Sequence, residues 1–93
     1  MFSLSIIIVN FEKPEYTLGC VQSIYDSRPT VSFEIILIDN GSKDGSLQRI
    51  REQAPVVIGI KTGENLGFTI ANNLGINNAR SPKRCSLRRV EML

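Results

Sequence analysis

Polar residues that can bind a ligand follow an apolar run near the middle of the chain, in the segment I-I-L-I-D-N-G-S at residues 35–42. The four apolar residues have no polar alternation, which is typical of a strand buried on both faces of a parallel sheet. Asp39 is therefore the first polar group after a buried strand, at the edge where open parallel sheets bind ligands. Its carboxylate can accept strong hydrogen bonds from ligand N–H and hydroxyl groups. From this segment alone, Asp39 and Asn40 are equally consistent with residues that only shape an Asx turn.

Two further segments carry residues of similar types. The apolar run S-L-S-I-I-I-V at residues 3–9 is followed by Asn10 and Phe11, and T-G-E-N-L-G occupies residues 62–67. Gly41 and Gly67 can adopt positive φ or let the backbone approach a ligand closely. A glycine in a plain turn explains Gly67 equally well. Phe11 can stack on a base, but aromatic side chains more often pack in a core.

Strand and helix patterns alternate along the chain around these polar residues. Strands are predicted at residues 3–9, 34–39 and 56–61. Helices are predicted from Pro14 to residue 27 and from residue 68 or 69 to residue 79. Another is predicted to follow a cap at Ser42 or Asp44 and to end at Pro55. Three strands that alternate with three helices predict an α/β fold, the three-layer, mostly parallel βαβαβα half of a doubly wound domain.

Composition and charge exclude several classes of protein. The 93 residues allow one small domain, and their 11 basic and 9 acidic side chains give no case for a nucleic-acid partner. No apolar run reaches the roughly 18–20 residues of a membrane span, and no secretory leader is predicted. The absence of histidine excludes His-based triads and His-ligated zinc. Two cysteines without metal-type spacing make a reducing, cytoplasmic location the default expectation.

The character of the chain changes at residue 80. Residues 1–79 hold six basic and eight acidic side chains, whereas residues 80–93 hold five basic side chains and one acidic one. Residues 81–93 have neither a strand run nor a helical stripe, so we expect a basic irregular tail after a domain of residues 1–80. This tail is either a solvated terminus, as is common, or the product of a truncated or out-of-frame end, which we favour.

Three motifs together resemble the N-terminal, nucleotide-binding half of family-2 glycosyltransferases, which have the GT-A fold. They are S-I-I-I-V-N-F at residues 5–11, L-I-D-N-G-S-K-D-G-S at 37–46 and E-N-L-G-F-T-I-A-N-N-L-G-I at 64–76. Each motif alone is weak, because many Rossmann-like proteins have an apolar strand that ends in Asp, but the ordered set is specific. The resemblance covers residues 3–80. It implies that a sugar is transferred from a nucleotide donor with inversion at the anomeric carbon.

The resemblance implies that eight residues bind the nucleotide-sugar donor: Val9, Asn10, Phe11, Asp39, Asn40, Gly41, Asn65 and Gly67. Asp39 matches the first carboxylate of the family's Asp-Asp-Gly-Ser motif, which holds the nucleoside. A carboxylate suits a pyrimidine N–H and ribose hydroxyls, so a UDP- or dTDP-linked donor is expected. Asn40 stands where many members have the second Asp. This Asp-Asn-Gly-Ser version resembles the branch that uses deoxy-sugar or furanose donors, such as rhamnosyltransferases.

The resemblance also implies metal ligands and a general base, which lie outside these three motifs. In the family a divalent cation, Mg²⁺ or Mn²⁺, is held by an Asp-x-Asp-type motif at the end of the fourth strand, and the general base lies farther on. Neither is recognisable after residue 80, so no catalytic or metal-binding residue is assigned. The cation is expected only in a complete parent protein, and this chain alone is expected to be inactive. Without a fourth strand, the edge from Ser5 to Val9 is expected to be open and to promote self-association.

Two alternatives remain open besides the donor-binding part of an enzyme. One is a binding module that holds a nucleotide or a partner without catalysis, and the other is an inert gene fragment. The chain lacks the G-x-x-x-x-G-K-[ST] motif and has no G-x-G-x-x-G after the first strand. A P-loop ATPase and an ordinary dehydrogenase are therefore not expected.

Overall fold

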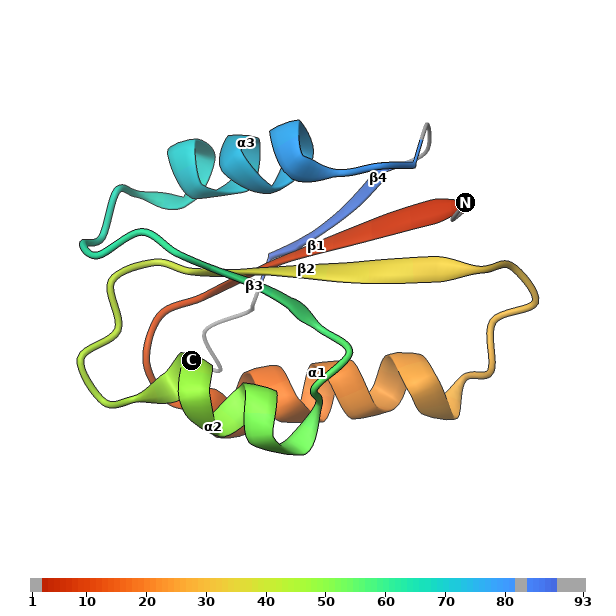
Figure 1. The fold of residues 1–93 in the computed structure, drawn as a ribbon, viewed down its shortest axis with the longest axis horizontal. Helices are drawn as coiled ribbons and strands as arrows, with labels where there is room; N and C mark the ends of the chain where they lie inside the picture. The colour runs from red at the N-terminus through yellow and green to blue at the C-terminus, as the bar shows by residue number, and fades with distance from the viewer. Residues whose placement is uncertain (1–2, 82–83, 89–93) are drawn as a thin grey trace.

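Strands and helices alternate along the chain in the computed structural model, which describes residues 3–81 and, for the backbone alone, 84–88. The elements are β1 (Leu4–Asn10), α1 (Pro14–Asp26), β2 (Phe33–Asp39), α2 (Ser46–Gln53), β3 (Ile58–Lys61), α3 (Phe68–Asn78) and β4 (Arg84–Arg88). They build one sheet of order β3-β2-β1-β4, in which every neighbouring pair is parallel. Figure 1 shows α3 on one face of this sheet and α1 and α2 on the other. The predicted three-layer α/β class is confirmed.

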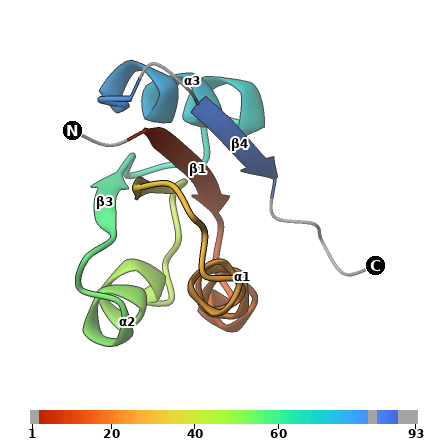
Figure 2. The same cartoon turned by 90° about the vertical axis from the view of Figure 1, so that its right-hand side faces the viewer.

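The core has two halves because successive strand residues point to opposite faces of the sheet. In one half, Ile6 and Ile8 of β1 pack with Val21 of α1 and Ile50 of α2. In the other half, Ile7 and Val9 of β1 and Ile36 and Ile38 of β2 pack with Ala71 of α3. Figure 2 shows the sheet between these two helical layers. The uninterrupted apolar runs in the sequence are thus explained by helices on both faces.

The second helix and the third strand are shorter than predicted. α2 begins at Ser46, after a loop in which Gly41 and Gly45 have φ of +91° and +74°. A positive φ is incompatible with a right-handed helix, and Gly45 is the N-cap of α2, so neither Ser42 nor Asp44 occupies the predicted cap position. β3 begins at Ile58 because the chain turns directly after α2, where the Val57 N–H donates to the Ala54 carbonyl at 3.1 Å.

The expectation that the sheet stops before a fourth strand is wrong. Within the segment expected to be an irregular tail, Arg84–Arg88 form β4, which pairs with β1 in a register from Ser5↔Arg84 to Val9↔Arg88. The local sequence R-C-S-L-R has no strand run, so pairing with the free edge of β1 decides this conformation. β1 therefore lies between β2 and β4. The open edge that was the reason to expect self-association is covered by β4.

A buried carboxylate joins the end of α3 to the sheet, at the edge opposite the carboxyl ends of the strands. The Glu34 side chain is 2% exposed. It accepts hydrogen bonds from the Ser5 hydroxyl (2.6 Å), the Arg80 backbone N–H (2.8 Å) and the Arg80 Nε (3.0 Å). The Ser5 hydroxyl in turn accepts one from the Ser81 N–H at 3.2 Å. Burial raises the pKa of Glu34, but the hydrogen bonds from Ser5 and Arg80 and the Arg80 charge lower it by more, so it lies below its ordinary value.

Replacing Glu34 with glutamine is expected to lower the free energy of unfolding at pH 7 by about 2 kcal/mol, since a hydrogen bond to a charged group contributes roughly 1.5–3 kcal/mol. Arg80 is largely exposed, so its ion pair contributes the smaller part. A carboxylate with a lowered pKa stabilises the fold above its unfolded pKa of about 4.3, and this contribution is lost as the pH falls through the folded pKa. Denaturant unfolding between pH 3 and 7 should therefore show a steeper acid loss for the wild type than for the variant. Glu52→Gln, at an exposed position on α2, should keep the wild-type slope, and a Glu34→Gln slope equal to that of the wild type would contradict the prediction.

Candidate functional site

Three loops meet at the carboxyl edge of the sheet, where β1, β2 and β3 end. Asn10, Asp39 and Lys61 are the last residues of these strands and are neighbours in register. The order of connection reverses at β1, since β2 and β3 lie on one side of it and β4 on the other. Open parallel sheets bind ligands at such a switch point. The loops after these three strands therefore define the candidate site.

Asp39 is the carboxylate at this edge and is 1% exposed. Its Oδ1 accepts hydrogen bonds from Asn10 Nδ2 (3.3 Å) and from the Ser42 hydroxyl. Asn10 is completely buried, and its Oδ1 accepts a hydrogen bond from the Thr17 hydroxyl of α1. Because a carboxylate only accepts, the contact with Asp39 identifies the facing atom of Asn10 as its NH₂ nitrogen. Among the residues that the structure describes, both donors to Asp39 contact Oδ1. Oδ2 is therefore the oxygen with capacity for a donor from a ligand.

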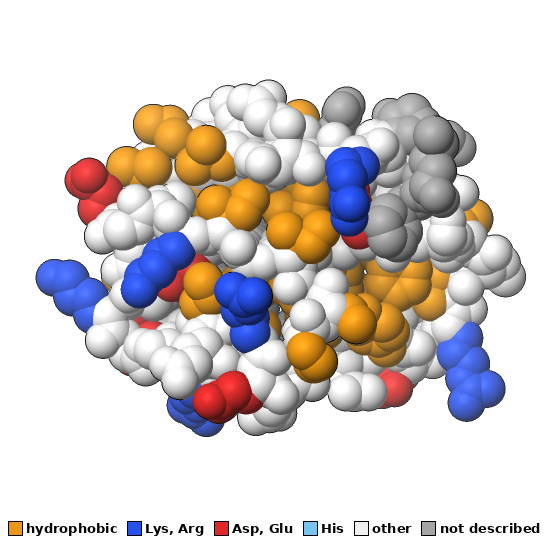
Figure 3. Space-filling model, in the orientation of Figure 1, with side chains coloured by type: hydrophobic (Ala, Val, Ile, Leu, Met, Phe, Trp, Pro, Cys, Tyr) orange, Lys and Arg blue, Asp and Glu red, His pale blue; other side chains and the backbone are white. Residues whose placement is uncertain are grey.

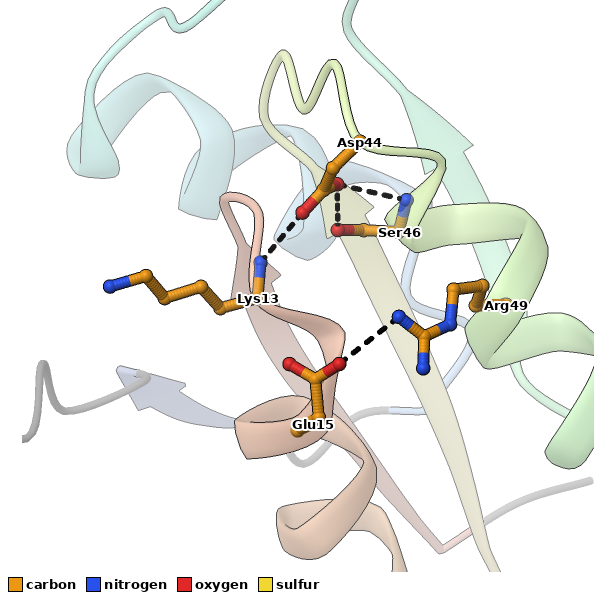
Figure 4. A network of polar contacts seen from close by, with 5 residues as sticks. All are labelled: Lys13, Glu15, Asp44, Ser46 and Arg49. Atoms are coloured by element: carbon orange, nitrogen blue, oxygen red, sulfur yellow. Dashed lines mark hydrogen bonds and ion pairs between the residues drawn. The ribbon is translucent and has the colours of Figure 1, made fainter.

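The loop after β1 contains a strained turn that the neighbouring loop holds in place. Glu12 and Lys13 have φ of +56° and +49°, a region that residues other than glycine rarely adopt. The Ser42 hydroxyl accepts a hydrogen bond from the Glu12 N–H at 2.6 Å. Asp44 accepts one from the Lys13 N–H at 2.9 Å and two more from the N–H (3.1 Å) and hydroxyl of Ser46, as Figure 4 shows. The hydrogen bond from the Ser46 hydroxyl contributes most to a lowered pKa of Asp44. The Asp44 carboxylate thus ties the turn to the start of α2.

Asn40 directly follows Asp39, but its side chain contacts a different loop. It is 3% exposed, and its Oδ1 accepts a hydrogen bond from the Leu66 N–H at 3.0 Å. Its Nδ2 donates to Asn65 Oδ1 (3.2 Å) and to the Gly67 carbonyl (3.4 Å). Asn65 Oδ1 also accepts a hydrogen bond from the Gly67 N–H at 2.9 Å. The side chains of Asp39 and Asn40 therefore have different partners: Asp39 contacts Asn10 at the end of β1 and Ser42, and Asn40 contacts the loop that leads to α3.

The two predicted glycines are required for different reasons. A Cβ on Gly41 would lie 2.4 Å from the backbone N of Asn65 and 2.4 Å from the backbone C of Glu64, so the glycine allows two protein loops to touch. At Gly67 nothing lies within 4 Å of the corresponding position. Its φ of +84° at the N-cap of α3 is the feature that favours glycine.

The remaining predicted residues have less uniform surroundings. Val9 is 8% exposed and packs in the core half that faces α3. Phe11 is 37% exposed and begins the loop after β1.

Thr17 was not predicted to belong to the site, because nothing in the sequence links it to Asn10. Ser42 and Asp44 were noticed only as possible helix caps, although their position in the N-G-S-K-D segment is a usable signal.

A cavity of about 440 Å³ lies beside the candidate site and does not contain it. It is lined by residues of α2 and by the last residue of β3: Leu47, Gln48, Arg51, Glu52 and Lys61. None of the eight predicted site residues lines it. On the face drawn in Figure 3, hydrophobic side chains gather across the middle, with Lys and Arg side chains around them. The candidate site is therefore defined by the hydrogen bonds between its loops and by its position at the carboxyl edge of the sheet. The cavity beside α2 is a separate feature.

Across residues 3–81 and the backbone of 84–88, no group of three or more His, Cys, Asp or Glu side chains could hold a metal ion. In the same part of the chain, no helix has the length and hydrophobicity needed to span a bilayer.

Comparison with known proteins identifies the family of this chain. Residues 5–83 match the family described as Glycosyl transferase family 2. This chain belongs to that family. It is 30% identical over 86 residues to the teichoic acid poly(glycerol phosphate) polymerase of Staphylococcus epidermidis. Among solved structures, it is similar to the mannosyltransferase PcManGT from Pyrobaculum calidifontis in complex with GDP-Man and Mn²⁺, with a TM-score of 0.69 at 20% identity over 84% of the chain.

The matched region includes all three loops at the carboxyl edge. The family predicted from the three motifs is confirmed, and so is the Rossmann-like half of a GT-A fold. The match to the polymerase covers 88% of this chain but only 12% of the polymerase. The match to the mannosyltransferase covers 24% of that protein chain. The comparisons do not distinguish a rhamnosyltransferase branch.

Proposed function

We propose that this chain is the donor-binding part of an inverting glycosyltransferase that transfers a sugar from a nucleotide-sugar to an acceptor. The observation that carries this proposal is the meeting of the three family motifs at one edge of the sheet. Asp39 there contacts Asn10 and Ser42, and Asn40 contacts the loop before α3. Membership of glycosyl transferase family 2 supports the reaction class.

Asp39 is the residue proposed to bind the nucleoside. One of its oxygens already accepts hydrogen bonds from Asn10 and Ser42. Uracil and thymine each present one ring N–H, which a single carboxylate oxygen can accept, whereas guanine presents two adjacent donors that suit both oxygens. We therefore propose a UDP- or dTDP-linked donor. Because Asp39 is 1% exposed, its contact with a base requires a local shift of groups that cover it, among them Ser42, whose hydroxyl donates to Asp39.

Further parts of the reaction are assigned to a longer parent protein, because the chain spans 12% of the polymerase and 24% of the mannosyltransferase that it matches. Among the described residues, no group of three or more His, Cys, Asp or Glu side chains could hold a metal ion. We propose that Mg²⁺ or Mn²⁺ and the general base are held elsewhere in the parent, and that this chain by itself binds the donor without transferring sugar. A deoxy-sugar donor and a cytoplasmic location are part of the same proposal.

Calorimetric titration of the 93-residue chain with nucleoside diphosphates tests this function. UDP or dTDP should bind more tightly than GDP and ADP, because one oxygen of Asp39 is committed to protein donors. Uridine without phosphates should still bind, more weakly. Equal binding of all four diphosphates, or binding of none, would contradict a donor-binding role.

A further inference from the structure

The orientation of the Asn40 amide is determined by its protein partners. A backbone N–H can only donate, so the atom of Asn40 that faces the Leu66 N–H at 3.0 Å must be the amide oxygen. By the same argument, the Gly67 N–H identifies the atom of Asn65 that it contacts as the oxygen. The Asn40 NH₂ group is therefore the donor between two acceptors, Asn65 Oδ1 at 3.2 Å and the Gly67 carbonyl at 3.4 Å.

This arrangement distinguishes asparagine from aspartate at position 40. A carboxylate keeps the acceptor for the Leu66 N–H but replaces the NH₂ donor with an oxygen that faces two other oxygens. Rotating the Asn65 amide would relieve that repulsion, but its Oδ1 would then be withdrawn from the Gly67 N–H. Ionised aspartate therefore cannot reproduce the contacts of Asn40, whereas protonated aspartic acid has an O–H that can donate in place of the NH₂ group.

We propose that Asn40 is a positioning residue, whose amide N–H holds residues 65–67 in the place that the donor site requires. This inference rests on the proposed donor-binding function for its effect on ligand affinity, but its effect on the loop stands apart from that function. The neutral Asn40 amide stands where many family members have a second, charged aspartate. In this chain, the second residue of the Asp-Asn-Gly-Ser segment acts on the nucleotide site through the loop, without contacting the nucleotide.

The surroundings of position 40 determine how a carboxyl group there would titrate. The side chains and backbone groups that contact the Asn40 amide carry no ionisable group. α3 contains no charged residue. The ionisable residues of the three loops and strand ends at this edge are Glu12, Lys13, Asp39, Lys43, Asp44, Lys61 and Glu64. A carboxyl group that is 97% buried among carbonyl oxygens is expected to have a raised pKa, because burial and facing acceptors both disfavour its charged form.

The loop is tested in the free protein by the protection factor of the Gly67 amide, measured by hydrogen exchange between pH 5 and 8.5. Asn40→Asp should lower this protection at least tenfold at pH 8.5 and restore it toward the wild-type value at pH 5. Asn65→Asp makes the same chemical change on the partner amide, but it should keep the protection, because the Asn65 oxygen only accepts hydrogen bonds. Asn65→Ala, at an exposed position that should not impair folding, should lower it at every pH.

UDP affinity over the same pH range tests the consequence for the site. Asn40→Asp should bind UDP at least tenfold more weakly than the wild type at pH 8.5 and recover at pH 5, with the same apparent pKa as the loop. Asn77→Asp, at an exposed position near the other end of α3, should bind as the wild type does. Unchanged Gly67 protection in Asn40→Asp at pH 8.5, loss of protection in Asn65→Asp, or a loss in Asn40→Asp that does not recover at pH 5 would each overturn the proposal. If the wild type binds no UDP, the proposed function fails, and the exchange measurements still decide the role of Asn40.

Discussion

Replacing Asp39 with asparagine is expected to weaken UDP binding roughly 10- to 100-fold. A hydrogen bond to a charged acceptor contributes roughly 1.5–3 kcal/mol, and 1.4 kcal/mol corresponds to a factor of ten in affinity. Asparagine keeps one oxygen, which can continue to accept from Asn10 Nδ2 and the Ser42 hydroxyl as Asp39 Oδ1 does. The atom that replaces Oδ2 becomes an NH₂ group, which cannot accept the N–H of a pyrimidine. Titration calorimetry of both proteins measures the difference.

Two further variants separate the role of Asp39 from general effects of charge and structure. Asp26→Asn makes the same change in charge at an exposed position at the end of α1 and should leave the affinity unchanged. Ser42→Ala removes one donor to Asp39 Oδ1 while keeping the carboxylate, so its effect should be smaller than that of Asp39→Asn. Equal affinities of the wild type and Asp39→Asn would show that Asp39 does not bind the nucleoside.

Replacing Gly41 with alanine is expected to lower the free energy of unfolding by about 3 kcal/mol and to weaken UDP binding. A left-handed or otherwise sparsely populated φ costs roughly 1–3 kcal/mol, and overpacking adds roughly 1–3 kcal/mol. The new Cβ would meet the backbone of Glu64 and Asn65 at 2.4 Å, and backbone atoms cannot move aside as a flexible side chain can. The loop that Asn40 holds would have to move away. Chemical denaturation and UDP titration measure the two effects.

Gly63→Ala is the matched control for this prediction. Gly63 has φ of +87°, close to the +91° of Gly41, but nothing lies within 4 Å of its Cβ position. Alanine there should cost about 1 kcal/mol from the backbone conformation alone. The difference between the two variants therefore measures the close contact between the loops. If both variants lose the same stability, the contact at Gly41 contributes nothing beyond its φ.

The strands and their common edge could be predicted from the sequence because their signal is local. The continuous apolar residues 6–9 and 35–38 indicate strands covered on both faces, as in a parallel sheet between two helical layers. The carboxyl ends of parallel strands meet at one edge, so the neighbourhood of Asn10 and Asp39 followed from the strand assignment. The structure places these two residues side by side in register.

Two features could not be predicted, because each depends on a partner distant in sequence. β4 forms where R-C-S-L-R lies beside the free edge of β1, about 80 residues earlier in the chain, and pairing with an existing edge can override a weak local pattern. Asp39 and Asn40 were interpreted as one motif at one site. Side chains of adjacent residues at the end of a strand point to opposite sides, so the Asn40 side chain contacts residues 65–67 before α3 and the Asp39 side chain contacts Asn10 and Ser42. The period of two in a strand indicates that the two side chains point apart, but it does not identify the loop that each side chain contacts.

The most direct test of a donor site at the carboxyl edge is the map of backbone amide shifts that UDP causes in the nuclear magnetic resonance spectrum of this chain. The largest changes are expected at Asn10 and Phe11, at residues 39–42 and at residues 65–67. The amides around the Glu34 carboxylate, at the opposite edge, should not change. Changes centred instead on the cavity residues Leu47, Gln48 and Arg51 of α2 would contradict a nucleotide site built around Asp39.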